Sequence, residues 1–322
     1  MHILINRTDA IGDVILTLPM CGLIKKHLNP VKISFLGNSY TRDIILSSEY
    51  VDNFVNVDKW NKISDREVVH ELKALNFDAV LHVLPQKRIA RLTKMAGIKL
   101  RIGTKNRIYH WFTCNKLVRL SRKNSDLHEA QLNILLLKTL GLQVKYQRSE
   151  LPLYYGLSRI SPLTHDQKVL LTTGKFNLLI HPKSRGNGRE WSLDSYKDLI
   201  DSLDPDRYQI FITGSENEKV FLTNWIKTLK NVIDVTGQFS LVEFISFVKN
   251  SDGLLASGTG PVHLAAALGI NSLGLYPNKR PIHAGRWAPL GVKASTITSE
   301  GAELQSISPL HVKNIINSWR KE

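Results

Sequence analysis

The sequence has few cysteines and no long apolar run. Its 322 residues include two cysteines, Cys21 and Cys114, which form no metal-binding or redox motif. No segment approaches the roughly 18 consecutive apolar residues of a transmembrane helix. The apolar start at residues 2–6 is too short for the core of a signal peptide. We therefore expect a cytoplasmic protein, one that lies on a membrane surface if it meets a membrane at all.

The motifs that mark several enzyme classes are also missing. There is no P-loop, no HExxH segment and no cluster of His and Cys residues with zinc-ligand spacing. We also find no Asp-x-Asp pair suited to holding a metal on a nucleotide-sugar pyrophosphate. These absences weigh against a metal-dependent mechanism.

Acidic residues are absent between Asp78 and Asp126, a segment that we call the basic window. It contains twelve cations and three aromatic residues: Lys87, Arg88, Arg91, Lys94, Lys99, Arg101, Lys105, Arg107, Lys116, Arg119, Arg122 and Lys123, with Tyr109, Trp111 and Phe112. The net charge of the chain is +15. A charge run is usually a solvated face, but ordinary surfaces mix both signs. We interpret the basic window as a binding face for an anionic partner, and Trp111 and Phe112 as candidates to enter a lipid interface.

Strand and helix patterns alternate twice along the chain. Buried strands are predicted at residues 2–6, 31–36, 55–57 and 77–83, and again at 176–181, 208–213, 232–235, 252–256 and 272–276. An irregular segment at 146–165 separates the two series. The pattern predicts an α/β protein with two doubly wound parallel-sheet domains, residues 1–155 and 156–322. Ligands of such sheets bind beyond the carboxyl ends of the strands, here in a cleft between domains. A final helix at 309–321 is free to pack back on the first domain.

The segment from Ala256 to Gly269, ASGTGPVHLAAALG, follows a buried apolar run. Its glycines permit a tight turn and uncover backbone N–H groups, and Pro261 suits a first helical turn. A strand, a small-residue loop and a helix start in this order can bind a nucleotide phosphate. A plain strand-to-helix turn explains the same residues equally well. His263, in the first helical turn, is either structural or faces a phosphate.

Three further polar clusters follow predicted strands. Asp13 ends the cluster at residues 7–13, at a predicted helix start, where the commonest use of Asp is as a cap. The cationic loop at 181–191 suits a pyrophosphate better than plain solvent. The acids of residues 214–218 either bind ribose hydroxyls or form a capping box.

Together these clusters resemble glycosyltransferase family 9, the ADP-heptose:lipopolysaccharide heptosyltransferases. The resemblance covers most of the chain and depends on the order and spacing of six segments: RTDAIGDVILTLP (7–19), HEAQLNILLLKTLG (128–141), IHPKSRGNGREW (180–191), ITGSENE (212–218), SGTGPVHLAAALG (257–269) and LYPNKRPIHAGRWAPLG (275–291). It implies a GT-B architecture, in which a first Rossmann-like domain holds the acceptor and a second holds the nucleotide-sugar donor. It also implies inverting transfer without a metal or another cofactor.

The resemblance implies a role for each cluster. Asp13 matches the family's catalytic aspartate, a general base that deprotonates the acceptor hydroxyl. Arg189 stands where the family usually has a phosphate-binding lysine, and Glu216 matches an acid near the donor's ribose. The implied donor-binding residues are Lys183, Arg185, Arg189, Glu216, Ser257, Gly258, Thr259, Gly260 and His263. The implied acceptor-binding residues are Arg7, Lys87, Arg88, Arg91, Arg101, Lys105, Arg107 and Trp111.

The implied partners are ADP-heptose and an anionic Kdo–lipid A core, met at the cytoplasmic face of the inner membrane. We expect a monomer without a nucleic-acid partner. One departure leaves the donor sugar open, because Gly258 stands where family members often carry aspartate. Two alternatives remain. A nucleotide-sugar 2-epimerase of the same fold would leave the basic window unexplained. A non-catalytic nucleic-acid-binding protein is motivated by net charge alone.

Overall fold

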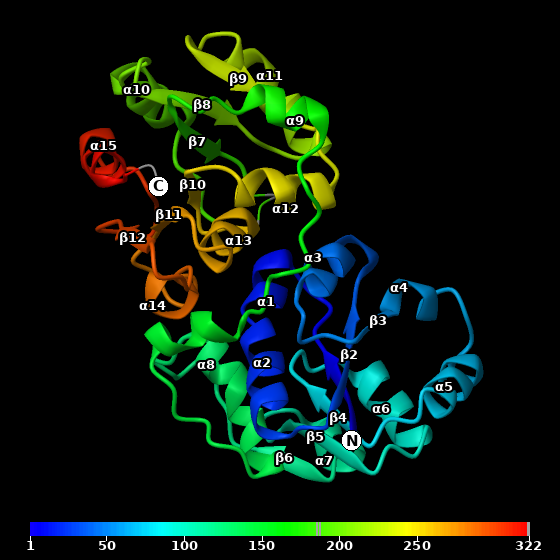
Figure 1. Cartoon of the computed structure of the whole chain (residues 1–322). Coiled ribbons are helices and arrows are strands. Elements are labelled where there is room, and N and C mark those ends of the chain that lie inside the picture. Colours follow the sequence, from blue (N-terminus) through cyan, green and yellow to red (C-terminus); the bar gives the residue numbers. More distant parts are fainter. Residues whose placement is uncertain (185, 187, 321–322) are drawn as a thin grey trace. The chain divides into compact units, whose positions relative to one another are not determined.

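The structure, a computed structural model, describes residues 1–184, 186 and 188–320. The chain forms two compact units, Met1–Arg159 and Ile160–Glu322 (Figure 1). The division therefore falls a few residues after the boundary that we expected at 155. Each unit contains one six-stranded sheet, in which neighbouring strands are parallel throughout.

The first unit alternates strands with helices from its first residues. Its strands are β1 (His2–Asn6), β2 (Lys32–Gly37), β3 (Asn53–Asn56), β4 (Ala79–His82), β5 (Leu100–Thr104) and β6 (Lys116–Val118). Its α-helices are α1 (Ile11–Ile15), α2 (Leu18–His27), α3 (Arg42–Ser47), α4 (Val57–Trp60), α5 (Asp65–Ala74), α6 (Lys87–Met95), α7 (Ile108–Thr113) and α8 (Glu129–Ile134). Short 3-10 helices are η1 (Ser39–Thr41), η2 (Leu135–Leu140) and η3 (Arg148–Tyr154).

The second unit repeats this alternation. Its strands are β7 (Phe176–His181), β8 (Tyr208–Ile212), β9 (Val232–Asp234), β10 (Gly253–Ser257), β11 (Asn271–Tyr276) and β12 (Ala294–Thr298). Its helices are α9 (His165–Leu170), α10 (Leu193–Ser202), α11 (Glu216–Ile226), α12 (Leu241–Lys249), α13 (Gly260–Ala267), α14 (Ala284–Trp287) and α15 (Pro309–Ser318).

The two sheets have the same strand order. It is β3-β2-β1-β4-β5-β6 in the first unit and β12-β11-β10-β7-β8-β9 in the second. In each sheet the first strand of the unit lies at the centre, beside the fourth, as in the Rossmann fold. Strand order reverses between these two strands, and ligands of such sheets bind at their carboxyl ends. The loops after β1 and β4, and after β7 and β10, are therefore where functional residues are expected.

Each sheet has its own apolar core. The central strands are buried along nearly their whole length, as in β4 and β7, because helices cover both faces of a parallel sheet. The last helix, α15, places Val312 and Ile316 in the core of the second unit, where it packs against α10. The apolar residues Val312 and Ile316 of this helix are thus used within the second unit.

The apolar residues and basic end of the segment at 14–27 predict one continuous helix, but the structure has two helices here, α1 and α2. Pro19 lies in the first turn of α2, where a proline starts a helix rather than continuing one. Asn133 on α8 stabilises the break, because its Nδ2 donates to the carbonyl oxygen of Leu16 (3.2 Å) and to Thr17 Oγ1 (3.1 Å). The prediction failed because this contact comes from a residue far along the chain.

Candidate functional site

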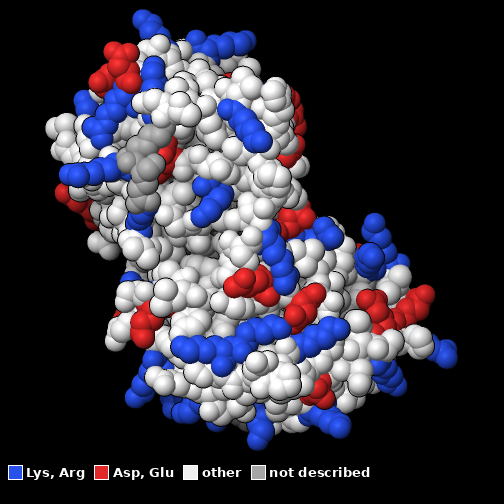
Figure 2. All heavy atoms as spheres, viewed as in Figure 1, with Lys and Arg blue, Asp and Glu red and all other residues white. Residues whose placement is uncertain are grey.

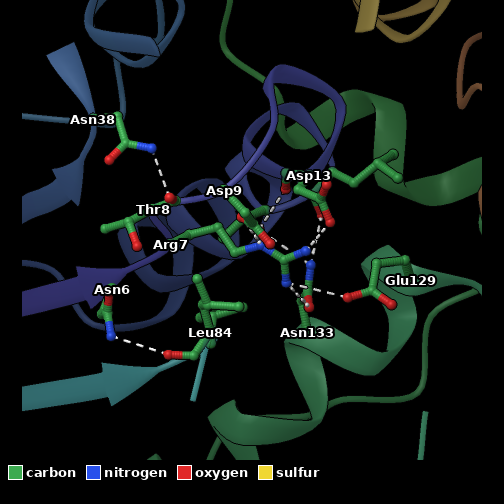
Figure 3. A network of polar contacts seen from close by, with 12 residues as sticks. Asn6, Arg7, Thr8, Asp9, Asp13, Asn38, Leu84, Glu129 and Asn133 are labelled. Carbon is green, nitrogen blue, oxygen red and sulfur yellow. Dashed lines mark hydrogen bonds and ion pairs between the residues drawn. The ribbon is translucent and has the colours of Figure 1, made fainter. Parts of the chain in front are cut away.

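A buried guanidinium organises the carboxyl edge of the first sheet. Arg7 directly follows β1, and its side chain is 3% exposed. Its Nε donates to Asp9 Oδ1 (2.7 Å) and its Nη1 to Glu129 Oε1 (3.1 Å). Its Nη2 donates to Asp13 Oδ1, so three carboxylates surround one cation (Figure 3). We expected Arg7 among the acceptor ligands, but the structure places it inside, bound to the chain's own carboxylates.

Asp13 lies in the first turn of α1 with its side chain one-fifth exposed. The N-cap of this helix is Ala10, so the hypothesis that Asp13 is a helix cap is wrong. Burial raises the pKa of Asp13 by more than the Arg7 guanidinium lowers it, and Glu129 raises it further. Asp13 thus accepts a proton more readily than an ordinary aspartate does, as a general base must.

A second guanidinium completes the network. Arg122 donates from Nε to Glu129 Oε1 (2.8 Å) and from Nη2 to Asn133 Oδ1 (3.1 Å). Three carboxylates therefore share two arginines, which leaves one negative charge in excess. Burial and this excess raise the pKa of Asp9 to about 6, although Arg7 opposes the shift. The pKa of Arg7 is held above its ordinary value, because the carboxylates outweigh the effect of burial.

The loops after β1 and β4 hold each other at the same edge. Asn6 Nδ2 donates to the carbonyl oxygen of Leu84 (3.1 Å), and Thr8 Oγ1 donates to Gln86 Oε1 (3.0 Å). These contacts, also drawn in part in Figure 3, fix the start of the segment that carries Asp13. The carboxylate network therefore lies at the point where strand order reverses, the expected place for a site.

The basic window contributes little to this network beyond Arg122. Arg88 and Arg91 on α6 form ion pairs with Asp65 on α5. Arg101 donates to the backbone carbonyl groups of residues 98 and 113. We expected a cationic face without acidic partners. This is wrong, because Asp65, which precedes the basic window in the sequence, forms ion pairs with two of its arginines. The remaining expected acceptor residues are exposed: Lys87, Lys105, Arg107 and Trp111.

In the second unit, the loops after β7 and β10 lie side by side at the carboxyl edge. Trp191 N donates to Ser257 Oγ (3.2 Å). A Cβ atom added to Gly188 would stand 3.4 Å from the carbonyl oxygen of Gly258. Ser257 is buried, and its hydroxyl binds the backbone of the neighbouring loop. Ser257, which we expected to contact a donor, thus holds the two loops together.

The N-terminus of α13 opens at this edge. Thr259 is its N-cap, but the Thr259 side chain makes no capping hydrogen bond. Thr259 Oγ1 is buried and has no hydrogen-bond partner among the described residues. Gly260 begins the helix, and His263 is buried within it. An unpartnered buried hydroxyl at a helix N-terminus favours an anion such as a phosphate.

A cavity of about 470 Å³ lies beside the loop that follows β7. Its lining residues are Lys183, Gly186, Glu190, Asn217, Glu218 and Phe221. Lys183 pairs with Glu190, and Arg189 pairs with the exposed Glu303 (Nε to Oε1, 3.1 Å). A ligand that uses either cation would displace or share these partners. Arg185, another expected donor residue, lies outside the described residues.

The acids after β8 have separate roles. Glu218 is buried and accepts hydrogen bonds from Ser215 N and Oγ, both at 2.7 Å. This is the capping box that the sequence left open as an alternative. Glu216, the first residue of α11, is exposed. Of the two glutamates, Glu216 is therefore the one that a ligand can reach.

The chain is similar to known proteins along most of its length. A family model described as "Glycosyltransferase family 9 (heptosyltransferase)" matches residues 66–312. The chain belongs to this family. A Haemophilus influenzae protein classed as a glycosyltransferase is 27% identical over 303 residues, which cover 89% of this chain and 86% of that protein. The lipopolysaccharide heptosyltransferase 1 of Campylobacter coli is 23% identical, over 86% of this chain and 84% of that protein.

The fold of this family 9 chain matches solved heptosyltransferase structures. The E. coli heptosyltransferase WaaC with ADP superposes with a TM-score of 0.77 and 19% identity, covering 98% of this chain and 99% of that one. The GT-B prediction is thereby confirmed. Within the described part of the chain, every helix is too short or too polar to cross a bilayer. The same part contains no group of three or more His, Cys, Asp or Glu residues arranged to hold a metal.

The family 9 motifs did not reveal the whole network. Glu129, Arg122 and Asn133 were missed as site residues, although Glu129 lies within a segment that carries the resemblance. One signal was available, since a glutamate in the otherwise apolar helix HEAQLNILLL is expected to need a buried cation. Two cations bind Glu129. Arg122 lies only 7 positions earlier in the chain, but Arg7 lies 122 positions earlier and could not be recognised as a partner from the sequence.

Proposed function

We propose that this family 9 protein transfers a heptose from ADP-heptose to the inner core of lipopolysaccharide, with inversion at the anomeric carbon and without a metal. The observation that carries the proposal is the placement of Asp13. Its partly exposed carboxylate, with a raised pKa, stands at the carboxyl edge of the first sheet and is oriented by a buried arginine. The names of the relatives, and the family itself, support a heptosyl donor.

In this mechanism Asp13 acts as the general base. The acceptor hydroxyl gives its proton to the Asp13 carboxylate while its oxygen bonds to the anomeric carbon. The bond between that carbon and the β-phosphate oxygen breaks, and ADP leaves with the electron pair. The attack occurs opposite the leaving group, so the anomeric configuration inverts. The Arg7 guanidinium keeps Asp13 in place and does not touch the substrate.

The second unit would stabilise the leaving group. Negative charge develops on the pyrophosphate, and the backbone N–H groups at the start of α13, with Thr259 Oγ1, are free to meet it. Lys183 and Arg189 add positive charge after exchange of their present partners. Glu216, exposed at the start of α11, is placed to accept from ribose hydroxyls.

Isothermal titration with ADP, UDP and GDP, in the presence of a chelator, tests the donor site first. We expect selective binding of ADP. Thr259→Val should weaken ADP binding about tenfold, since it removes a hydrogen bond to a charged group. Ser272→Ala is a matched control, because Ser272 Oγ is likewise buried and unpartnered among the described residues but lies near the amino end of β11.

Transfer itself is tested with ADP-heptose and a Kdo-containing lipid A acceptor, with mass spectrometry of the product. Gain of one heptosyl group by the acceptor is the expected result. Preference for UDP or GDP would reject the donor but keep a glycosyltransferase. Binding of no nucleotide would reject both assignments. We further infer that the protein works as a monomer at the cytoplasmic face of the inner membrane, where such an acceptor is anchored.

A further inference from the structure

Helix α7 exposes an unusual amount of apolar surface. Ile108 is 81% exposed, Trp111 63% and Phe112 71%, within a helix of six residues. Their spacing of three and four positions places them on one face. Met95, at the end of α6, is 52% exposed, and α6 and α7 pack together. An exposed apolar group of this kind marks an interaction surface rather than a chance exception.

The protein holds this face outward. On the opposite side of α7, His110 is fully buried and its Nδ1 accepts from Thr104 N (2.9 Å). Trp111 Nε1 donates to the carbonyl oxygen of Lys105 (2.9 Å). The indole N–H is therefore already satisfied, and the ring can enter an apolar medium without losing a hydrogen bond.

Exposed cations without an ion pair among the described residues flank α7 in the sequence. They are Lys99, Lys105, Arg107, Lys116 and Arg119. Lys94 joins the two helices, because its Nζ donates to the carbonyl oxygen of Phe112 (2.7 Å). Lys and Arg side chains project along the lower rim of the first unit in Figure 2, in the region where Figure 1 shows β6 and α7.

We propose that α7, with Met95 and these flanking cations, is the surface by which the protein docks on a bilayer of anionic phospholipid. Apolar side chains would enter the interface while the cations contact headgroup phosphates. A second copy of the chain fits less well, since it would bring the same cations against each other. Nucleic acid would attract the cations but would leave Ile108 and Met95 without an apolar environment.

The inference deepens the proposed function, because a lipid-anchored acceptor is reached at a membrane. It can nevertheless be tested without substrate. Co-sedimentation of the full-length protein with vesicles that contain phosphatidylglycerol, and with neutral phosphatidylcholine vesicles, measures binding directly. We expect binding to the anionic vesicles that weakens as salt is added.

The decisive variant is Ile108→Ser with Phe112→Ser, which removes two inserting side chains and leaves every charge in place. It should bind anionic vesicles at least about tenfold more weakly, since burial of one large apolar side chain is worth about this factor. Val292→Ser with Leu310→Ser is the matched control, because Val292 (88%) and Leu310 (64%) are equally exposed in the second unit. This control should bind as the unmodified protein does.

Several results would overturn the assignment of α7. They are failure of the unmodified protein to bind anionic vesicles, equal binding by the Ile108/Phe112 variant, and self-association in sedimentation velocity that this variant abolishes. Tight binding to single-stranded RNA without vesicle binding would also reject it. Affinity for ADP should be the same in all variants. Loss of vesicle binding with normal nucleotide binding, or the reverse, separates this inference from the proposed function.

Discussion

The ring of Tyr276 occupies the space that any side chain at residue 258 would need. A Cβ atom added to Gly258 would stand 2.3 Å from Tyr276 Cε1, and one added to Gly274 would stand 2.6 Å from Cε2. Gly258 and Gly274 therefore leave room for one aromatic ring at the ends of neighbouring strands. This explains in physical terms why residue 258 is a glycine in this chain.

Gly258→Asp should therefore destabilise the protein. The new side chain must displace a buried ring or the backbone, and overpacking of this kind costs about 1–3 kcal/mol. Urea denaturation measures the free energy of unfolding. Gly258→Asp combined with Tyr276→Ala should lose less than the sum of the two single changes, since the second makes room for the first. Strict additivity would show that the two residues do not compete for space.

Removal of the Tyr276 hydroxyl should not harm the ligand-free protein. Tyr276 Oη is buried and has no hydrogen-bond partner among the described residues. An unsatisfied buried hydroxyl is costly, so Tyr276→Phe should raise the free energy of unfolding by about 1 kcal/mol. Urea denaturation of Tyr276→Phe measures this change in the free energy of unfolding. A clear loss of stability would mean that the hydroxyl has a partner within the protein.

Asp13→Asn should abolish most of the transfer activity. The amide cannot accept the acceptor's proton, and loss of a general base typically lowers kcat by about 100- to 10,000-fold. ADP affinity should be unchanged, because the residues expected to hold the nucleotide belong to the second unit. Asp9→Asn is the matched control, since it removes a neighbouring carboxylate of the same network. A similar loss of kcat in both variants would point to a structural role for the network.

The pH dependence of transfer should reflect the shared charge of the network. The pKa of Asp13 is raised, so kcat should fall as pH decreases through that raised value and the base becomes protonated. Asp9→Asn removes a negative neighbour and should shift the acid limb of the profile to lower pH. If the acid limb does not move, the charge of Asp9 does not influence the pKa of Asp13.

Asp9 should also affect stability with a definite sign. Its pKa is about 6 in the folded protein, above its ordinary value of 3.8, so the folded state holds a proton that the unfolded chain has released. Protonated Asp9 therefore contributes to the stability of the folded protein at low pH, and this stabilisation is lost as pH rises through about 6. The stability advantage of Asp9→Asn over the unmodified protein should therefore grow across this window, as thermal unfolding at pH 4 and pH 7 can measure.

Arg7→Met should be among the most destabilising single changes in the first unit. It leaves Glu129 buried with less compensating charge, and breaking a buried ion pair in this way costs about 3–5 kcal/mol. Arg189→Met is a suitable comparison, because its ion pair with Glu303 is about half exposed and should contribute less than about 1 kcal/mol. Chemical denaturation of both variants tests this difference. Equal losses would contradict the structural role given to Arg7.

Local pattern was enough to predict four of the six strands of the first sheet, five of the six strands of the second, and the loops that carry the site. Strands such as residues 2–6 and 176–181 are continuous apolar runs, and the helices between them are amphipathic. The basic window was harder, and its elements β5, β6, α6 and α7 were not predicted. The strands β5 and β6 are short and contain cations, so their apolar pattern is weak. Helix α6 is amphipathic, with Ile89 and Leu92 on its buried face, so its pattern was available in the sequence and was missed.

Partners across long sequence distances could not be predicted. The sequence suggested that Arg7 binds an acceptor, and only the fold brings Glu129 to it. The same holds for Arg88 and Arg91, whose partner Asp65 precedes the basic window. A charge run in a sequence is therefore evidence for a binding face only after its partners elsewhere in the chain are known.

The Arg7 network also has a consequence for synthesis of the chain. The first sheet is complete in sequence at Val118, with β6, but Glu129 follows only on α8. A nascent chain that ends between them has every strand of the sheet and a central arginine without its most buried counter-ion. The first unit therefore cannot reach its final packing on the ribosome until α8 has left the exit tunnel, and a pause in translation before that point would prolong an incompletely packed intermediate.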